Sequence, residues 1–463
     1  MNSQNIINRV IPLPQNIKVN NGISFDKKRI GIKVEAGHSP VIDTAVTILN
    51  HFIEESHFKP DFQIELSIIN EDKDSKVVKG LKNARFKQQA YAILPVTKKK
   101  VFSGILIKAY SDVGLLYGVR TLAQLLSMDN EMIVIPEVKV FDWPDVEFRG
   151  QWGGTSDKDI PYYSQFKYNA IDFKVVLSAD EKGNAEVTHN DSLYLKAEKY
   201  GVDVAATISH LEQISRSGFL KSRPEIESIP SEERKNRCDY FPGLCMRHPV
   251  TKEMVTEWFL KMAENKHVHK ILVWLSEEES PCFCERCKGE EPFSLEVECL
   301  LEAYQKMKKK YPDVRLGIML SQGSFKVTEK LANMLPKEVS LTYYDGGRTY
   351  DSGQYEMVLP ELLDYIQNGG LLGIYPQITH SWRTVFPMRS PYFIKYRCDE
   401  FVKKDIHRVI GYAVPDNRYH DFNLLCMLEW LWNNKGRDEK SFTMTYAMLN
   451  DYDPSLYYQY VKT

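Results

Sequence analysis

From Phe148 to about residue 414, short apolar segments alternate with amphipathic ones, and this alternation limits the folds open to the chain. Segments 253–266 and 295–312 carry apolar residues at the three- and four-residue spacing of helices. About eight strands alternating with helices over roughly 300 residues are typical of a (β/α)8 TIM barrel, whose site lies at the carboxyl ends of the strands. The predicted strands are 147–153, 169–178, 202–209, 270–276, 315–321, 339–344, 371–376 and 408–414.

Residues 1–143 differ in pattern and predict a small α+β domain ahead of the barrel. Pro144 marks a plausible boundary. The predicted fold class is therefore α/β, with an N-terminal domain at 1–143 and a TIM-barrel domain with C-terminal helices at 144–463. The predicted N-terminal strands are 28–34, 61–69, 89–96 and 104–110, and the predicted helices are 45–55 and 111–128.

Charge and hydropathy exclude several classes of partner. A formal net charge of −2 gives no electrostatic basis for binding nucleic acid or an anionic membrane. The chain starts without an apolar signal segment, and no apolar run approaches the length of a membrane span. We therefore expect a soluble protein, cytoplasmic as given, or secreted or periplasmic if a signal peptide has been removed. The sequence does not indicate an oligomeric state.

Two nearby segments at the predicted domain boundary carry a family resemblance. GLLYGVRTLAQLL (114–126) and VIPEVKVFDWPDVEFRG (134–150) closely resemble the domain junction of family 20 glycoside hydrolases, the β-N-acetylhexosaminidases. In that family a small α+β domain precedes a catalytic TIM barrel. GVDVAATISHLEQI (201–214) is similar to the third-strand region of the hexosaminidase D-like branch, whose H-I-G-x-D-E signature falls on VWLSEEE (273–279).

The resemblance implies a catalytic role for two adjacent glutamates. In the family, the substrate's own 2-acetamido oxygen attacks the anomeric carbon; one carboxylate orients the acetamido group and a second protonates the leaving oxygen. By alignment Glu277 is the orienting residue and Glu278 the general acid. Glu277 stands where the family has aspartate, which moves the carboxylate by about an ångström. A one-residue shift, to Glu278 and Glu279, is the alternative.

The expected activity is removal of β-linked N-acetylhexosamine from an oligosaccharide or glycoconjugate, with no cofactor required. Two alternatives remain open: a divergent glycosidase acting on a sugar without an acetamido group, and a catalytically inactive carbohydrate-binding barrel. The departure from the Asp-Glu pair favours the latter, and the glutamates could also form an ordinary solvated loop.

Further residues are candidates for substrate binding. The resemblance implies that Arg149 grips the 3- and 4-hydroxyls of the sugar; its alternative is a salt bridge at the bottom of the barrel. The other candidates end predicted strands or follow them, and are Asp180, His210, Glu212, Tyr344, Asp345 and Trp382.

Three cysteines in CFCERC, namely Cys282, Cys284 and Cys287, have a spacing that suits a metal. A structural zinc needs a fourth ligand, which Cys238, Cys245 or His248 could supply from the preceding loop; Cys238 is our first choice. Free thiols or a disulfide of the Cys238–Cys245 type are the alternatives. If a metal binds there, the glutamates are the catalytic residues and the cysteines stabilise the loop that carries the glutamates.

Overall fold

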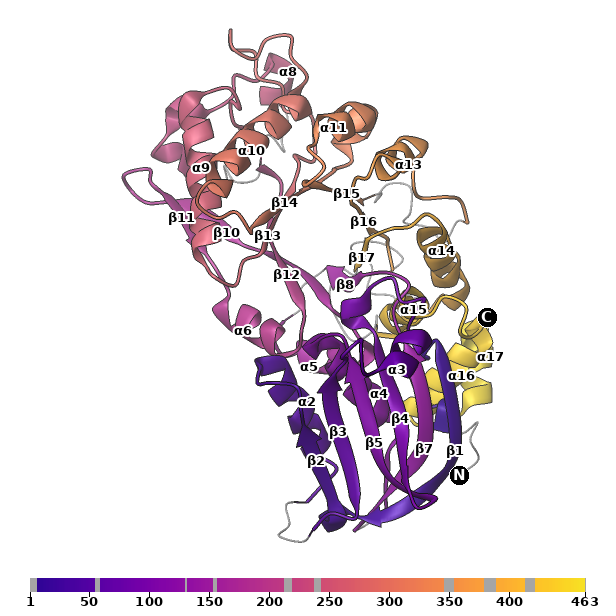
Figure 1. Cartoon of the computed structure of the whole chain (residues 1–463). Helices are drawn as coiled ribbons and strands as arrows, with labels where there is room; N and C mark the ends of the chain where they lie inside the picture. The colour runs from indigo at the N-terminus through magenta and orange to yellow at the C-terminus, as the bar shows by residue number, and fades with distance from the viewer. Residues whose placement is uncertain are drawn as a thin grey trace.

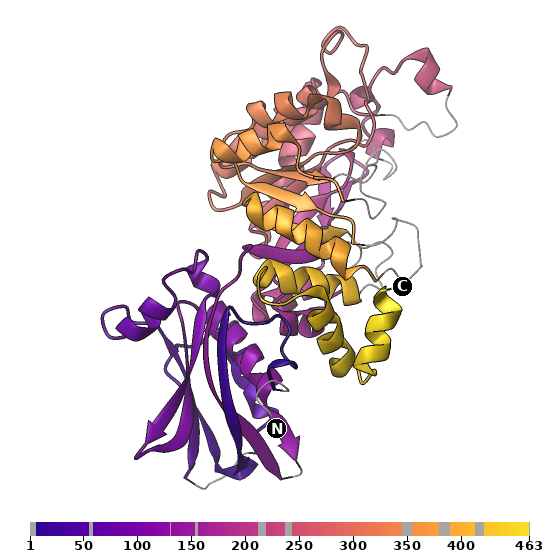
Figure 2. The same ribbon diagram turned by 90° about the vertical axis from the view of Figure 1, so that its right-hand side faces the viewer.

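The structure is a computed structural model with a sheet domain followed by a barrel domain (Figure 1). It describes residues 6–54, 59–129, 131–152, 156–211, 219–236, 243–344, 354–378, 389–412 and 421–462. Figure 2 shows the N-terminal domain at the foot of the molecule and the C-terminal helices beside the barrel. Within the described part of the chain, none of the helices combines the length and the apolar character needed to cross a membrane.

The N-terminal domain is built on a seven-stranded sheet of order β1-β7-β4-β5-β3-β2, with β6 paired to β7. Helix α4 (Asp112–Leu125) begins where the Ser111 hydroxyl accepts a hydrogen bond from the Gly114 amide, and its apolar residues pack on β4 and β5. The strands are β1 Asn16–Asp26, β2 Ile30–Val34, β3 Phe62–Ile68, β4 Tyr91–Lys98, β5 Val101–Ala109, β6 Ser127–Asp129 and β7 Met132–Asp142. The remaining helices are α2 Pro40–Asn50 and α3 Ser75–Gly80.

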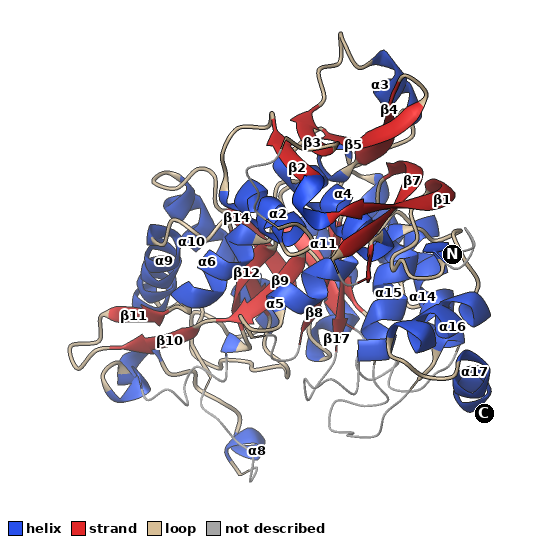
Figure 3. Cartoon of the chain, turned by 90° about the horizontal axis from the view of Figure 1, so that it is seen from below, coloured by secondary structure: helices blue, strands red, loops and turns tan. Residues whose placement is uncertain are grey.

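The second domain is a closed barrel of parallel strands in the order β8-β9-β12-β13-β14-β15-β16-β17. Viewed from below, helices surround the barrel strands (Figure 3). This confirms the predicted α/β fold class with a TIM barrel. The strands are β8 Phe148–Trp152, β9 Ala170–Lys174, β12 Asp203–Ile208, β13 Lys270–Trp274, β14 Arg315–Met319, β15 Ser340–Tyr344, β16 Leu372–Tyr375 and β17 Arg408–Tyr412.

Proline starts four of the helices between residues 249 and 403, because its missing N–H costs nothing in the first helical turn. These helices are α9 Pro249–Glu264, α10 Pro292–Lys308, α13 Pro360–Gln367 and α14 Pro391–Lys403. The others are α5 Ile160–Tyr163, α6 Asp191–Lys199, α8 Glu232–Lys235, α11 Thr328–Met334, α15 Asp421–Trp432, α16 Glu439–Leu449 and α17 Pro454–Lys462.

One predicted strand, 169–178, is two strands in the structure. Residues Ala170–Lys174 form barrel strand β9, whereas β10 (Val176–Ala179) pairs with β11 (Ala185–Thr188) as a separate hairpin. This hairpin projects from the barrel and packs on α9 (Figure 3). No glycine or proline interrupts residues 169–178, so the sequence concealed the point at which the chain leaves the barrel.

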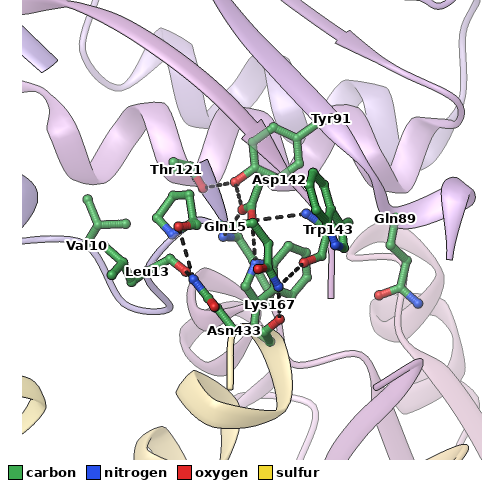
Figure 4. A network of polar contacts seen from close by, with 12 residues as sticks. Val10, Leu13, Gln15, Gln89, Tyr91, Thr121, Asp142, Trp143, Lys167 and Asn433 are labelled. Carbon is green, nitrogen blue, oxygen red and sulfur yellow. Dashed lines mark hydrogen bonds and ion pairs between the residues drawn. The ribbon is translucent and has the colours of Figure 1, made fainter. Parts of the chain in front are cut away.

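A buried polar network joins the two domains (Figure 4). The Asp142 carboxylate, at the end of β7, forms an ion pair with Lys167 Nζ at 3.1 Å, and both side chains are fully buried. Asp142 Oδ1 also accepts hydrogen bonds from the Gln15 amide and from Trp432 Nε1, both at 2.8 Å. Tyr91 donates its hydroxyl to Asp142 Oδ2. One carboxylate thus connects the chain's start, the sheet, the barrel and α15.

Gly150 lies on β8, where the backbone passes close to the neighbouring strand β9. A Cβ at this position would lie 1.8 Å from the Ala170 carbonyl oxygen, whereas a Cβ at exposed Gly37 would meet nothing within 4 Å. We expect Gly150→Ala to lower the free energy of unfolding by about 2 kcal/mol or more, since the backbones must separate. Gly37→Ala is the control. Equal urea midpoints for the two variants would contradict this packing.

Candidate active site

Five aromatic side chains lie inside the carboxyl end of the barrel, and each is the last residue of its strand. Neighbours across the sheet are in register, so that Tyr344 pairs with Tyr375 and Tyr412 with Trp152. All belong to, or pack against, the one apolar cluster that the strands enclose. We call this set the aromatic layer: Trp152 of β8, Trp274 of β13, Tyr344 of β15, Tyr375 of β16 and Tyr412 of β17.

The aromatic layer is continuous across the barrel. The Trp274 ring lies 5.9 Å from Trp152 and 5.3 Å from Tyr344, edge to face in both cases. Tyr344 in turn lies 4.9 Å from Tyr412. The buried indole N–H of Trp274 has no hydrogen-bond partner among the described residues. The barrel therefore ends in flat apolar faces with polar groups at their edges, which suits a ring-shaped polar ligand.

Buried charges support the aromatic layer from below. Arg408 donates to Asp172 and, at 3.0 Å, to Asp203, and the Tyr375 hydroxyl donates to the other oxygen of Asp172. Burial tends to lower the pKa of Arg408, but the two carboxylates raise it overall. Because both Asp172 oxygens accept bonds within the barrel, Asp172 fixes the orientation of Tyr375.

His210 lies beside the aromatic layer, just after β12. Its ring centroid is 4.5 Å from that of Trp274, and its Nδ1 is 2.8 Å from the Leu275 carbonyl oxygen. Because a carbonyl only accepts, Nδ1 carries the proton, and Nε2 is the proton acceptor in neutral imidazole. His210 has a φ of +32°, an uncommon conformation for a residue other than glycine and one that concentrates at functional sites.

Glu277 and Glu278 follow β13, the fourth strand of the barrel, and both side chains are exposed. The preceding backbone is held firmly: buried Glu296 of α10 accepts the Ser276 amide at 3.1 Å, and Ser321 donates to the Ser276 carbonyl. The Gly323 amide donates to the Glu277 carbonyl at 3.0 Å. The carboxylate pair therefore stands on a fixed loop base at the carboxyl end of the barrel.

Of the predicted ligand-binding residues, the structure brings His210 and Tyr344 together at the carboxyl end of the barrel, where both contact Trp274. Glu212, Asp345 and Trp382 lie outside the described residues.

Arg149 is a correction, because it lies at the opposite end of its strand from Trp152 and is fully buried. Its guanidinium donates to the Gln89 side chain at 2.8 Å and to the Lys167 carbonyl at 3.0 Å, and it stacks over the Trp432 ring. Burial lowers the pKa of Arg149 to about 10. The predicted grip on sugar hydroxyls is wrong, since this side chain belongs to the domain junction.

Asp180 is a second correction. It sits in the turn of the β10–β11 hairpin and not at the end of a barrel strand. Its carboxylate accepts the backbone amides of Lys182 at 2.9 Å and Asn184 at 2.8 Å, and the Asn184 side chain at 2.7 Å. The hydrogen bond from the Asn184 side chain lowers the pKa of Asp180. Asp180 therefore stabilises a turn.

Among the described residues, one group of thiols has the arrangement of a metal site. Cys245 joins Cys282, Cys284 and Cys287, and the four Sγ atoms lie within 4.8 Å of one another. Cys238, our first choice as fourth ligand, lies outside the described residues. The fourth thiol of the group is instead Cys245, which precedes α9.

Comparison with known proteins agrees with this architecture. Residues 8–143 match the family profile described as Glycosyl hydrolase family 20, domain 2. This match covers the N-terminal domain, which is therefore similar to domain 2 of family 20 glycoside hydrolases. Sequence comparison with curated proteins finds no significant match.

Solved structures show that the likeness in fold extends to the barrel. The GH20 exo-β-N-acetylglucosaminidase from Vibrio harveyi superposes with a TM-score of 0.65 at 14% identity, over 98% of this chain and 78% of the other. The β-N-acetylhexosaminidase from Bacteroides fragilis gives 0.64 at 14% identity, over 98% and 96%. That from Streptomyces coelicolor gives 0.60 at 14%, over 98% and 96%. At this identity, the likeness describes the fold.

Sequence reasoning overlooked Trp152, Tyr375 and Tyr412 of the barrel. A usable signal was present, because each is an aromatic residue at the final position of an apolar strand. Trp152 lies four residues beyond Phe148 and Tyr412 two residues beyond Ile410, and both of these earlier residues belong to or contact the same interior cluster. Reading which positions face inward, strand by strand, would have identified the aromatic layer.

Proposed function

We propose that the chain is a glycoside hydrolase that removes β-linked N-acetylhexosamine from an oligosaccharide or glycoconjugate, using the substrate's acetamido group as the nucleophile. The observation that carries the proposal is the adjacent pair Glu277 and Glu278, which begins three residues after Trp274, the last residue of the fourth barrel strand and a member of the aromatic layer. The family 20 domain at residues 8–143 and the barrel fold shared with β-N-acetylhexosaminidases support it.

In the proposed mechanism, Glu278 gives its proton to the glycosidic oxygen as the bond from that oxygen to the anomeric carbon breaks. The acetamido oxygen forms a new bond to the anomeric carbon, and Glu277 orients the acetamido group and stabilises its developing positive charge. Water then attacks the anomeric carbon, whose bond to the acetamido oxygen breaks and returns the acetamido group, and the water passes a proton to Glu278, which restores the acid. Two inversions give net retention of configuration.

The surrounding residues supply positioning in this proposal. The aromatic layer gives the sugar a flat apolar floor, and the Trp274 N–H is a free donor among the described residues. His210 presents Nε2 as an acceptor next to that floor.

A second candidate, a carbohydrate-binding barrel without turnover, rests on a specific observation. Glu277 and Glu278 are both exposed, and Glu277 replaces the aspartate that the family uses. An extra methylene places the carboxylate differently by about an ångström, a change that can remove about a hundredfold of rate. The aromatic layer does not depend on that geometry and would still bind a sugar.

A panel of chromogenic substrates tests the proposal. We expect hydrolysis of the 4-nitrophenyl β-glycosides of N-acetylglucosamine or N-acetylgalactosamine, and none of the β-glucoside, because glucose lacks the acetamido nucleophile. Turnover of the plain glucoside would indicate a divergent glycosidase with a conventional carboxylate pair. Intact substrates together with calorimetric binding of N-acetylglucosamine would identify the binding barrel and overturn the proposed function.

A further inference from the structure

Four thiols from two separate loops meet beside the carboxyl end of the barrel. Cys245 precedes α9, and Cys282, Cys284 and Cys287 belong to the loop that leads from β13 to α10. Cys245 Sγ lies 3.6 Å from the Sγ atoms of both Cys284 and Cys287. All four cysteines are free, so this grouping is not a disulfide.

The spacing of the sulfurs fits a tetrahedral metal. Four thiolates at the usual Zn–S distance of about 2.3 Å would have edges of about 3.8 Å. The two measured edges are 3.6 Å and every other pair lies within 4.8 Å. Cys245, Cys282 and Cys287 are buried and Cys284 is partly exposed, so an ion at the centre would be shielded from water.

Backbone amides point at the sulfurs, as they do where thiolate charge must be stabilised. The Ile229 amide donates to Cys282 Sγ at 3.4 Å, and the amides of Arg286 and Arg247 donate to Cys284 and Cys287. The chain turns tightly at the C-x-x-C segment, where the amides of Cys287 and Lys288 both donate to the Cys284 carbonyl, at 3.0 and 2.9 Å.

We propose that Cys245, Cys282, Cys284 and Cys287 bind one structural zinc ion. An all-thiolate tetrahedral set selects zinc or iron, and four protein ligands leave no open position for water or substrate. The site is therefore structural. It differs from the catalytic pair in residues and in chemistry, and it holds whether or not the barrel hydrolyses sugars.

The proposed zinc joins the loop before α9 to the loop that starts with the glutamates. Arg234 strengthens the same connection, because it donates to the Glu279 carbonyl and, at 2.7 Å, to the Ser280 hydroxyl. Only Pro281 separates this contact from Cys282, the first thiol. The ion would thus limit the movement of the segment that carries Glu277 and Glu278.

Metal analysis of the purified full chain tests the proposal without reference to activity. We expect about one zinc per chain, falling below about a tenth of that in Cys284→Ser and Cys287→Ser, since loss of one thiolate opens the site. Cys398→Ala, which changes a buried thiol on α14, is the matched control and should retain the zinc.

Cobalt replacement covers the case in which a cysteine variant fails to fold. Wild-type protein freed of zinc and loaded with Co²⁺ should show thiolate-to-cobalt charge-transfer bands and the intense visible bands of tetrahedral cobalt. Absence of metal from folded wild-type protein, iron in place of zinc, a disulfide detected by mass spectrometry, or full zinc content in Cys284→Ser would each overturn the proposal.

Discussion

Glu278→Gln is expected to lower kcat for an N-acetylhexosaminide by about 10²- to 10⁴-fold, the usual contribution of a general acid, with little change in KM. Glutamine keeps the size of the side chain but has no acidic proton to give. The loss should be smaller for a leaving group of low pKa, such as dinitrophenolate, because its oxygen needs little protonation. Steady-state kinetics with two leaving groups measures both effects.

Two further variants make this result specific. Glu285→Gln removes an exposed glutamate from the same loop and should leave kcat unchanged. Glu279→Gln shows which glutamate is the general acid. If Glu279→Gln lowers kcat more than Glu278→Gln does, the acid is Glu279 and the alignment is shifted by one residue. Equal rates for all three variants and wild type would exclude both Glu278 and Glu279 as the general acid.

Asp142→Asn is expected to lower the free energy of unfolding by about 3–5 kcal/mol, the usual cost of removing one partner from a buried ion pair. Lys167 would keep a charge in a fully buried position, where burial already lowers its pKa. The asparagine oxygen could still accept from the Gln15 amide and Trp432 Nε1, but its NH2 group would then face Lys167 Nζ, which is itself a donor. Guanidinium denaturation of the variant and the wild type gives the loss.

A double-mutant cycle separates the ion pair from its surroundings. The double variant Asp142→Asn, Lys167→Met should lose less free energy of unfolding than the two single variants together, since it no longer buries an unpaired charge. Asp61→Asn is the control, because it breaks an exposed pair with Arg29 at 2.7 Å and should cost only about 0–1 kcal/mol. A loss in Asp142→Asn no larger than in Asp61→Asn would show that the network does not hold the domains together.

The sequence was sufficient for the architecture because the barrel depends on a pattern repeated eight times. A wrong boundary in one strand, as at 169–178, leaves the alternation recognisable. Individual site residues have no such redundancy. Asp180 was misplaced because the sequence of residues 169–178 does not reveal where the chain leaves the barrel for the β10–β11 hairpin.

Arg149 illustrates a different difficulty. Resemblance matches a residue to a position along a strand, but the direction of a side chain alternates with every residue and the two ends of a strand serve different purposes. Phe148, with Trp152, contacts the cluster inside the barrel, whereas Arg149 is bound to the junction with the N-terminal domain. Cys245 is a related case: the thiol spacing 282–287 predicted a metal site, but only the fold could choose among fourth ligands.

The place of Trp432 has a consequence for biosynthesis. Its indole is part of the apolar core of the N-terminal domain, and Asn433 donates to the carbonyls of Leu13 and Pro14 at 3.1 Å. Position 432 follows the last barrel strand, β17, and is therefore synthesised after all eight barrel strands. The first domain to be synthesised therefore lacks one of its core side chains until nearly the whole barrel has emerged. We expect nascent chains to stay sensitive to protease in their N-terminal sheet until that point, so that the two domains mature together rather than in the order of their synthesis.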